Sequence, residues 1–94
     1  MDTVKFLRIP LSMIDYVGDL DAFQGLTAEQ LASLPEEYTP DETAGIIASL
    51  RFAAEHPEFD FASLLPGISA SNGQIHVFLV KIYRSFQEAG LAPL

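Results

Sequence analysis

The sequence predicts an all-α fold: one compact domain over residues 1–94, made of four to five short helices with a long C-terminal helix. Two capping boxes predict helix starts, since in each a Ser or Thr and a Gln three residues later bond each other's free backbone N–H groups. Apolar residues recur at helical spacing after these starts. In addition, 49% of the residues are hydrophobic and 19% are charged, the balance of a chain that folds rather than stays disordered.

The beginning of the chain is apolar. Residues 3–9 end at Pro10, which predicts a short strand or an extended arm lying on the core. Ser12 stands where an N-cap would stand and predicts a helix that begins after it. Gly25 is expected to end this helix or the turn that follows it. The apolar positions of this helix are Met13, Ile14, Val17 and Leu20.

A short helix is predicted next. Thr27 and Gln30 form the first capping box, and the helix that they open should run through Leu34 and stop at Pro35. A polar loop then leads from Pro35 to Thr39, where the next helix begins.

The segment after Thr39 carries the clearest helix signal in the chain. Thr39 is expected to cap this helix, and Pro40 takes the first helical position, where its missing N–H is not needed. The helix should end near His56, because Pro57 disfavours helical geometry in the residue before it. Its predicted inner face carries Ile46, Ile47, Leu50, Ala53 and Ala54.

The C-terminal third of the chain is predicted to hold the longest helix. Residues 58–65 form a short helix or turn, which the Pro-Gly pair at 66–67 breaks. Ser71 and Gln74 then make the second capping box, and they open a helix that reaches about Ala89. Its predicted inner face carries Ile75, Phe78, Leu79, Ile82, Tyr83 and Phe86.

Residues 74–83 also allow a second interpretation, because they are rich in β-branched and aromatic side chains. In an α+β fold, they would form a small sheet by pairing with residues 3–9. We prefer a helix, since apolar residues fill both alternating faces of the segment and capping signals bracket it. The box at Ser71 precedes it, and Gly90 follows it as the left-handed residue of a Schellman motif, with Leu91 as the apolar contact.

The sequence lacks the motifs of common enzyme classes. It has no cysteine, which excludes a disulfide, a thiolate metal site and a cysteine nucleophile, and which fits a cytoplasmic protein. No phosphate-binding glycine loop, serine-hydrolase elbow or zinc-protease motif is present. His56 and His76 lie on different predicted elements, and neither has a catalytic partner nearby in sequence. We therefore expect no enzyme activity and no cofactor.

Metal binding and membrane insertion are not expected either. The acidic residues around Pro57 offer nitrogen and oxygen ligands to zinc or manganese, but acid-rich loops of this kind are usually solvated. No apolar run approaches the roughly 18–20 residues that span a bilayer, and the N-terminus does not resemble a secretory signal. The metal ligands considered are Glu55, His56, Glu58 and Asp60.

The negative charge of the chain is concentrated in its middle. The net charge is −8, and residues 15–60 hold eleven acidic side chains but a single basic one, Arg51. A field of this sign attracts basic partners, although it also serves plain solubility. We expect a small, non-enzymatic protein–protein interaction module, such as a regulator, an inhibitor or an assembly factor, with a basic partner. The acidic contact residues would be Asp15, Asp19, Asp21, Glu36, Glu37, Asp41 and Glu42.

The last predicted helix offers a second contact surface. Val77 and Val80 point away from its inner face, and Lys81 and Arg84 lie beside them. A helix that is apolar on nearly all sides is either central in its fold or has a second partner. These four residues would bind another protein or another copy of this chain.

Residues 61–91 combine a short apolar segment, a Gly-Ile-Ser turn at 67–69 and a predicted helix that ends in Ala-Gly-Leu. In this pattern they resemble a bacterial helix-turn-helix domain. The resemblance implies a DNA-binding regulator with the last helix in the major groove. The net charge disfavours nucleic acid, because affinity for phosphates comes from cations. The residues that the resemblance places against DNA are Asn72, Gln74, His76, Lys81 and Arg84.

Overall fold

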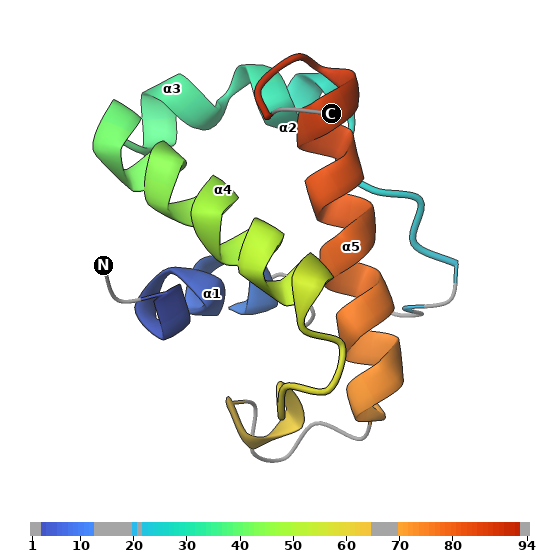
Figure 1. The fold of residues 1–94 in the computed structure, drawn as a ribbon. Coiled ribbons are helices and arrows are strands. Elements are labelled where there is room, and N and C mark those ends of the chain that lie inside the picture. The colour runs from blue at the N-terminus through green and yellow to red at the C-terminus, as the bar shows by residue number, and fades with distance from the viewer. Residues whose placement is uncertain (1–2, 13–19, 21, 65–69, 93–94) are drawn as a thin grey trace.

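Helices make up the regular secondary structure of the described chain. The computed structural model describes residues 3–12, 20, 22–64 and 70–92, and within them the prediction of an all-α fold is confirmed. Its radius of gyration, 12.4 Å, is that of a compact globule of this length. The elements are α1 (Thr3–Leu11), α2 (Ala28–Ala32), α3 (Leu34–Glu37), α4 (Pro40–Glu55), the 3-10 helix η2 (Ala62–Leu64) and α5 (Asn72–Glu88) (Figure 1).

The predicted strand or arm over residues 3–9 is wrong, and so is the sheet that would pair it with residues 74–83. Both segments are helical, in α1 and α5. In α1, Leu7 and Leu11 lie one turn apart and are 0% and 1% exposed. Burying these two side chains outweighs the hydrogen bond that Pro10 removes from the last turn of the helix. Most of the helix predicted after Ser12 falls on residues 13–19, outside the described part of the chain, and its predicted continuation is wrong, since Leu20 and Ala22 lie in turns and residues 23–27 are not helical.

Capping boxes begin three of the helices. The two predicted boxes are confirmed: Thr27 accepts from the Gln30 N–H at 3.1 Å, and Ser71 accepts from the Gln74 N–H at 3.2 Å. The predicted cap of α4, Thr39, is also part of a full box, because its own N–H donates to the Glu42 carboxylate at 2.9 Å. Each start is therefore specified within four residues of sequence.

Pro35 does not end a helix as predicted. It lies in the first turn of α3, directly after α2 has ended at Ala32. The N–H groups of a first turn have no partner within the helix, so the missing N–H of proline is tolerated there. The predicted polar loop from Pro35 to Thr39 is consequently a one-turn helix and its cap.

The end of α5 is the predicted Schellman motif. Gly90 has φ +78°, and its N–H donates to the Gln87 carbonyl at 3.1 Å. The Leu91 N–H donates to the Phe86 carbonyl at 2.8 Å, which completes the motif. The expected apolar contact is shifted by one residue, since Leu91 is 46% exposed while Ala92 is 7% exposed.

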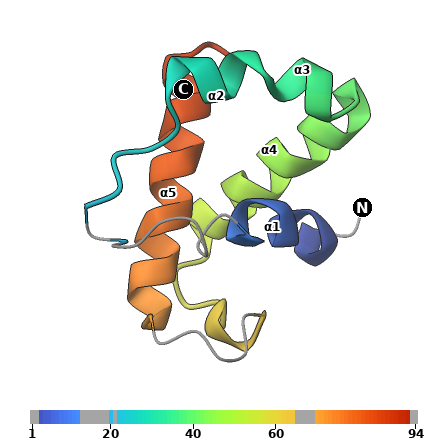
Figure 2. The same ribbon diagram turned by 180° about the vertical axis from the view of Figure 1, so that it is seen from behind.

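The core lies where α4 packs against both α1 and α5 (Figures 1 and 2). The segment 22–27 runs beside α5, to which Phe23 is joined by a ring contact with Phe78 (Figure 2). Among the described elements, α5 contributes the most buried side chains, so this helix is central in the fold. The core residues with at most 4% exposure are Leu7, Leu11, Ile46, Leu50, Ala53, Phe61, Ile75, Phe78, Leu79, Ile82 and Phe86.

A glycine in the middle of α4 lets α1 approach closely. A Cβ atom on Gly45 would lie 2.6 Å from Cζ of Phe6, so the Phe6 ring rests on the backbone of α4. Glycine within a helix costs about 1 kcal/mol relative to alanine. Here the close packing of the two helices offsets that cost.

Candidate protein-binding site

Four of the predicted acidic contact residues lie together at the junction of α3 and α4. Glu36 and Glu37 end α3, Asp41 and Glu42 belong to the first turn of α4, and all four are exposed. The positive end of the α4 dipole stabilises carboxylates in that turn. This acidic junction is therefore a surface feature, as predicted, although Glu42 also serves the capping box. Asp15, Asp19 and Asp21 lie outside the described residues.

The outer face of α4 carries an apolar groove that the sequence did not lead us to expect. It consists of two hollows, of about 420 and 390 Å³, which adjoin each other because both are lined by Ala44 and Ile47. We call it the α4 groove. One hollow is lined by Ala44, Ile47, Ala48, Arg51, Phe52, Glu55 and Tyr83, and the other by Pro35, Tyr38, Pro40, Thr43, Ala44 and Ile47.

One residue of the predicted inner face of α4 belongs to the groove instead. Ile46 is buried, whereas Ile47 is half-buried and lines both hollows. The spacing of Ala44, Ile47, Ala48 and Arg51 at i, i+3, i+4 and i+7 marks a second helical face. That spacing is the sequence signal that could have revealed the groove.

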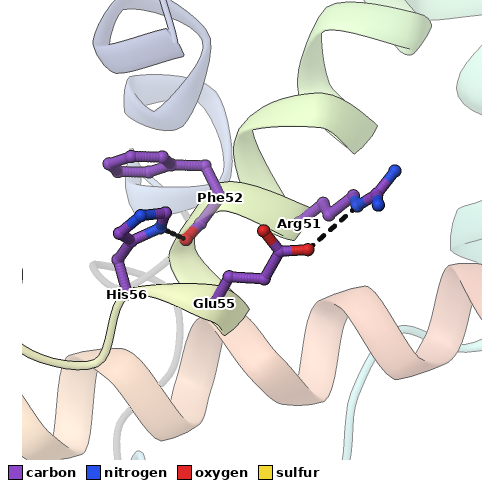
Figure 3. A network of polar contacts seen from close by, with 4 residues as sticks. All are labelled: Arg51, Phe52, Glu55 and His56. Atoms are coloured by element: carbon purple, nitrogen blue, oxygen red, sulfur yellow. Dashed lines mark hydrogen bonds and ion pairs between the residues drawn. The ribbon is translucent and has the colours of Figure 1, made fainter.

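A single ion pair stands at the C-terminal end of the groove. Arg51 Nε and Glu55 Oε1 are 3.0 Å apart, and both side chains are more than half exposed (Figure 3). The hydrogen bond and the negative charge of Glu55 raise the pKa of the Arg51 guanidinium above its ordinary value. Because Glu55 balances this cation, the acidic junction sets the sign of the field along the groove.

His56 caps the same end of α4 and is engaged within the fold. Its Nδ1 bonds the Phe52 carbonyl at 2.8 Å, and its ring stacks on that of Phe52 with centroids 4.3 Å apart (Figure 3). Asp60 accepts from the Ser63 N–H and thereby starts η2. In the described chain, no three His, Asp or Glu side chains are grouped closely enough to hold a metal ion.

The second predicted surface lies on the outer side of α5. Val77 is 48% exposed and Arg84 is exposed, while Val80 and Lys81 are half-buried. Lys81 and Arg84 line a polar hollow of about 210 Å³ together with Gln24 and Glu88. The predicted outward position is confirmed for Val77 and holds only in part for Val80, and binding at this surface stays a prediction.

Two of the residues that the helix-turn-helix resemblance placed against DNA are used inside the fold. Asn72 donates to the Phe59 carbonyl at 2.8 Å and accepts from the Ala62 N–H at 3.0 Å. Gln74 accepts from the Ser71 N–H at 2.8 Å. The residues of the proposed turn, 65–69, lie outside the described chain.

The bonds of Asn72 join the start of α5 to the segment before it, so we expect Asn72→Ala to destabilise the protein. The loss of two part-buried bonds should lower the free energy of unfolding by about 1–3 kcal/mol in urea denaturation followed by circular dichroism. Gly73→Ala is the matched control, because its Cβ would meet nothing closer than 3.9 Å and alanine favours the helix. Equal stability of both variants would show that Asn72 has no such role.

Comparison with models of protein families, with curated protein sequences and with solved structures found no match. None of the helices in the described part of the chain is long and apolar enough to cross a lipid bilayer.

Proposed function

We propose that this chain is a small protein-binding module whose α4 groove takes an amphipathic helix with basic side chains from a partner protein. The observation that carries the proposal is the pair of adjoining apolar hollows on α4, one of which is lined by Pro35, Tyr38 and Pro40, the chain neighbours of the four exposed carboxylates. A 16-residue helix is about 24 Å long, so the groove offers room for several turns of a partner helix.

The shape of the groove favours a helix over an extended peptide. Its floor contains Ala44 and Ala48, one turn apart, whose small side chains let another backbone approach. Tyr38 stands at one end, and Phe52 and Tyr83 stand at the other. Helix-in-groove recognition uses such apolar troughs, and aromatic residues around them commonly act as energetic anchors.

The charge around the groove favours a basic partner. Four carboxylates of the acidic junction lie at its N-terminal end, while Arg51 is paired with Glu55 at the other. Complementary charge increases the association rate and excludes acidic competitors. Binding should therefore weaken as salt is added. A module of this kind would act as a regulator, an inhibitor or an assembly factor.

Two synthetic helical peptides test this proposal. They share one pattern of leucines at i, i+3 and i+7, and their remaining positions are lysine in one peptide and glutamate in the other. We expect the lysine peptide to bind by calorimetry, with amide shifts in nuclear magnetic resonance spectra at Ala44, Ile47 and Ala48. The glutamate peptide should not bind, and the affinity of the lysine peptide should fall with added salt.

Matched variants of the protein locate the binding site. Ile47→Glu places a charge on the groove floor. It should lower the affinity for the lysine peptide by about tenfold to a hundredfold, which is the usual loss when a residue that dominates a binding interface is removed. Val77→Glu makes the same change on the exposed face of α5 and should leave the affinity unchanged. Equal binding of both peptides, or a loss in Val77→Glu instead of Ile47→Glu, would contradict the proposal.

A further inference from the structure

A second cavity lies where α1, α2, α3, α4 and α5 meet, away from the groove floor, and one side of it is open to solvent. Its volume is about 180 Å³. An apolar cavity of about 150 Å³ holds a benzene molecule, which sets the size of ligand that would fit here.

The inner walls of the cavity are apolar. Ile46, Ile82 and Phe86 come from the buried faces of α4 and α5. Leu26, which precedes α2, and Leu34, which begins α3, complete these walls. Polar groups lie among the other lining residues, where the exposed Gln30 and Glu37 mark the opening to solvent. Apolar walls with a few polar groups at one side are typical of small-molecule sites.

A negative charge lies at the opening of the cavity. Glu37 is the charged residue among the described residues that line it, and no arginine, lysine or histidine is among them. Within the described chain, no ion pair engages the Glu37 carboxylate. Ser12 and Tyr38 add hydroxyl oxygens that can accept hydrogen bonds. An ammonium group at the opening would meet acceptors, whereas a carboxylate would meet the like charge of Glu37.

We infer that this cavity binds a small organic amine, with a single ring or a short alkyl chain inside and its ammonium group at Glu37. The inference does not depend on a peptide binding in the groove, although Glu37 also belongs to the acidic junction beside it. Tyr38 lines both spaces, and it is the one described residue that they share.

Three probes with the same aromatic ring test the inference: 2-phenylethylamine, 2-phenylethanol and 3-phenylpropanoate. Titration followed by nuclear magnetic resonance should show ring-current shifts at Leu34, Ile46 and Ile82. The amine should bind most tightly, at least about tenfold better than the carboxylate, as expected for one charge pair near the surface. In Glu37→Gln, the affinity for the amine should fall to that for the alcohol, and the affinity for the alcohol should stay unchanged.

A second variant tests the cavity itself. Leu34→Phe enlarges a half-buried side chain on its wall and should abolish binding of the amine and the alcohol alike. Circular dichroism and the melting temperature check that both variants remain folded. The inference is overturned if no probe shifts the cavity resonances, if the amine shifts Ala44 and Ile47 instead, or if Glu37→Gln binds the amine as tightly as the wild-type protein does. The two proposals can still fail separately, because the peptide experiment is read at Ala44 and Ile47 and the amine experiment at Ile46 and Ile82.

Discussion

Replacing Phe78 with alanine is expected to lower the free energy of unfolding by about 3–5 kcal/mol, the usual range for a fully buried phenylalanine. Phe78 is 0% exposed on α5, and its ring centroid lies 4.7 Å from that of Phe23. The substitution removes this aromatic contact and leaves a cavity between the central helix and the segment 22–27. The surrounding helices can close such a cavity only in part.

Urea denaturation followed by circular dichroism at the helix band measures this effect. Val77→Ala is the matched control, since it truncates the neighbouring side chain, which is 48% exposed, and should change stability by less than about 0.5 kcal/mol. If Phe78→Ala leaves too little folded protein to measure, Phe78→Leu provides a smaller cavity at the same place. A loss below about 1 kcal/mol in Phe78→Ala would mean that α5 is not the centre of the core.

A second large loss of stability is expected when Gly25 is replaced with alanine. This residue has φ +107°, and a Cβ on it would overlap the Ser85 hydroxyl. That hydroxyl accepts from the Leu26 N–H at 2.8 Å and donates to the Lys81 carbonyl at 3.0 Å. Gly25→Ala should therefore combine backbone strain with the loss of these bonds. In the same urea experiment, we expect it to lower the free energy of unfolding by about 2–5 kcal/mol.

Two controls separate the strain from the overlap. Gly90 also has positive φ, but a Cβ on it would meet nothing within 4 Å, so Gly90→Ala carries the strain alone and should cost about 1–2 kcal/mol. Ser85→Ala removes the overlapping hydroxyl, so Gly25→Ala should cost less in the Ser85→Ala background than it does in the wild-type protein. Strict additivity of the Gly25 and Ser85 substitutions would contradict the overlap.

The parts of the fold that are encoded locally could be predicted from the sequence. The boxes at Thr27 and Ser71, the cap at Thr39 and the turn at Gly90 each depend on residues a few positions apart. The error over residues 3–9 has the opposite cause. Pro10 resembles a local stop signal, and what keeps the segment helical is the burial of its leucines against α4, which no local pattern reveals.

The candidate site was predictable to a smaller extent. The exposure of Glu36 and Asp41 follows from their charge, because isolated carboxylates are rarely buried. The α4 groove could not be predicted as a whole, since Tyr83 and Pro35 reach it from segments outside α4 in the sequence. The cavity beside Glu37 depends in the same way on α1 to α5 meeting at one place.

The contact between Phe6 and Gly45 limits how this sequence can change. A methyl group at position 45 fits only if the aromatic ring at position 6 rotates away or is replaced by something smaller, because the ring tip already occupies that space. A smaller residue at position 6 alone would leave a hollow above the glycine. We therefore expect the two positions to be coupled, so that the effect of a substitution at position 45 depends on the size of the residue at position 6.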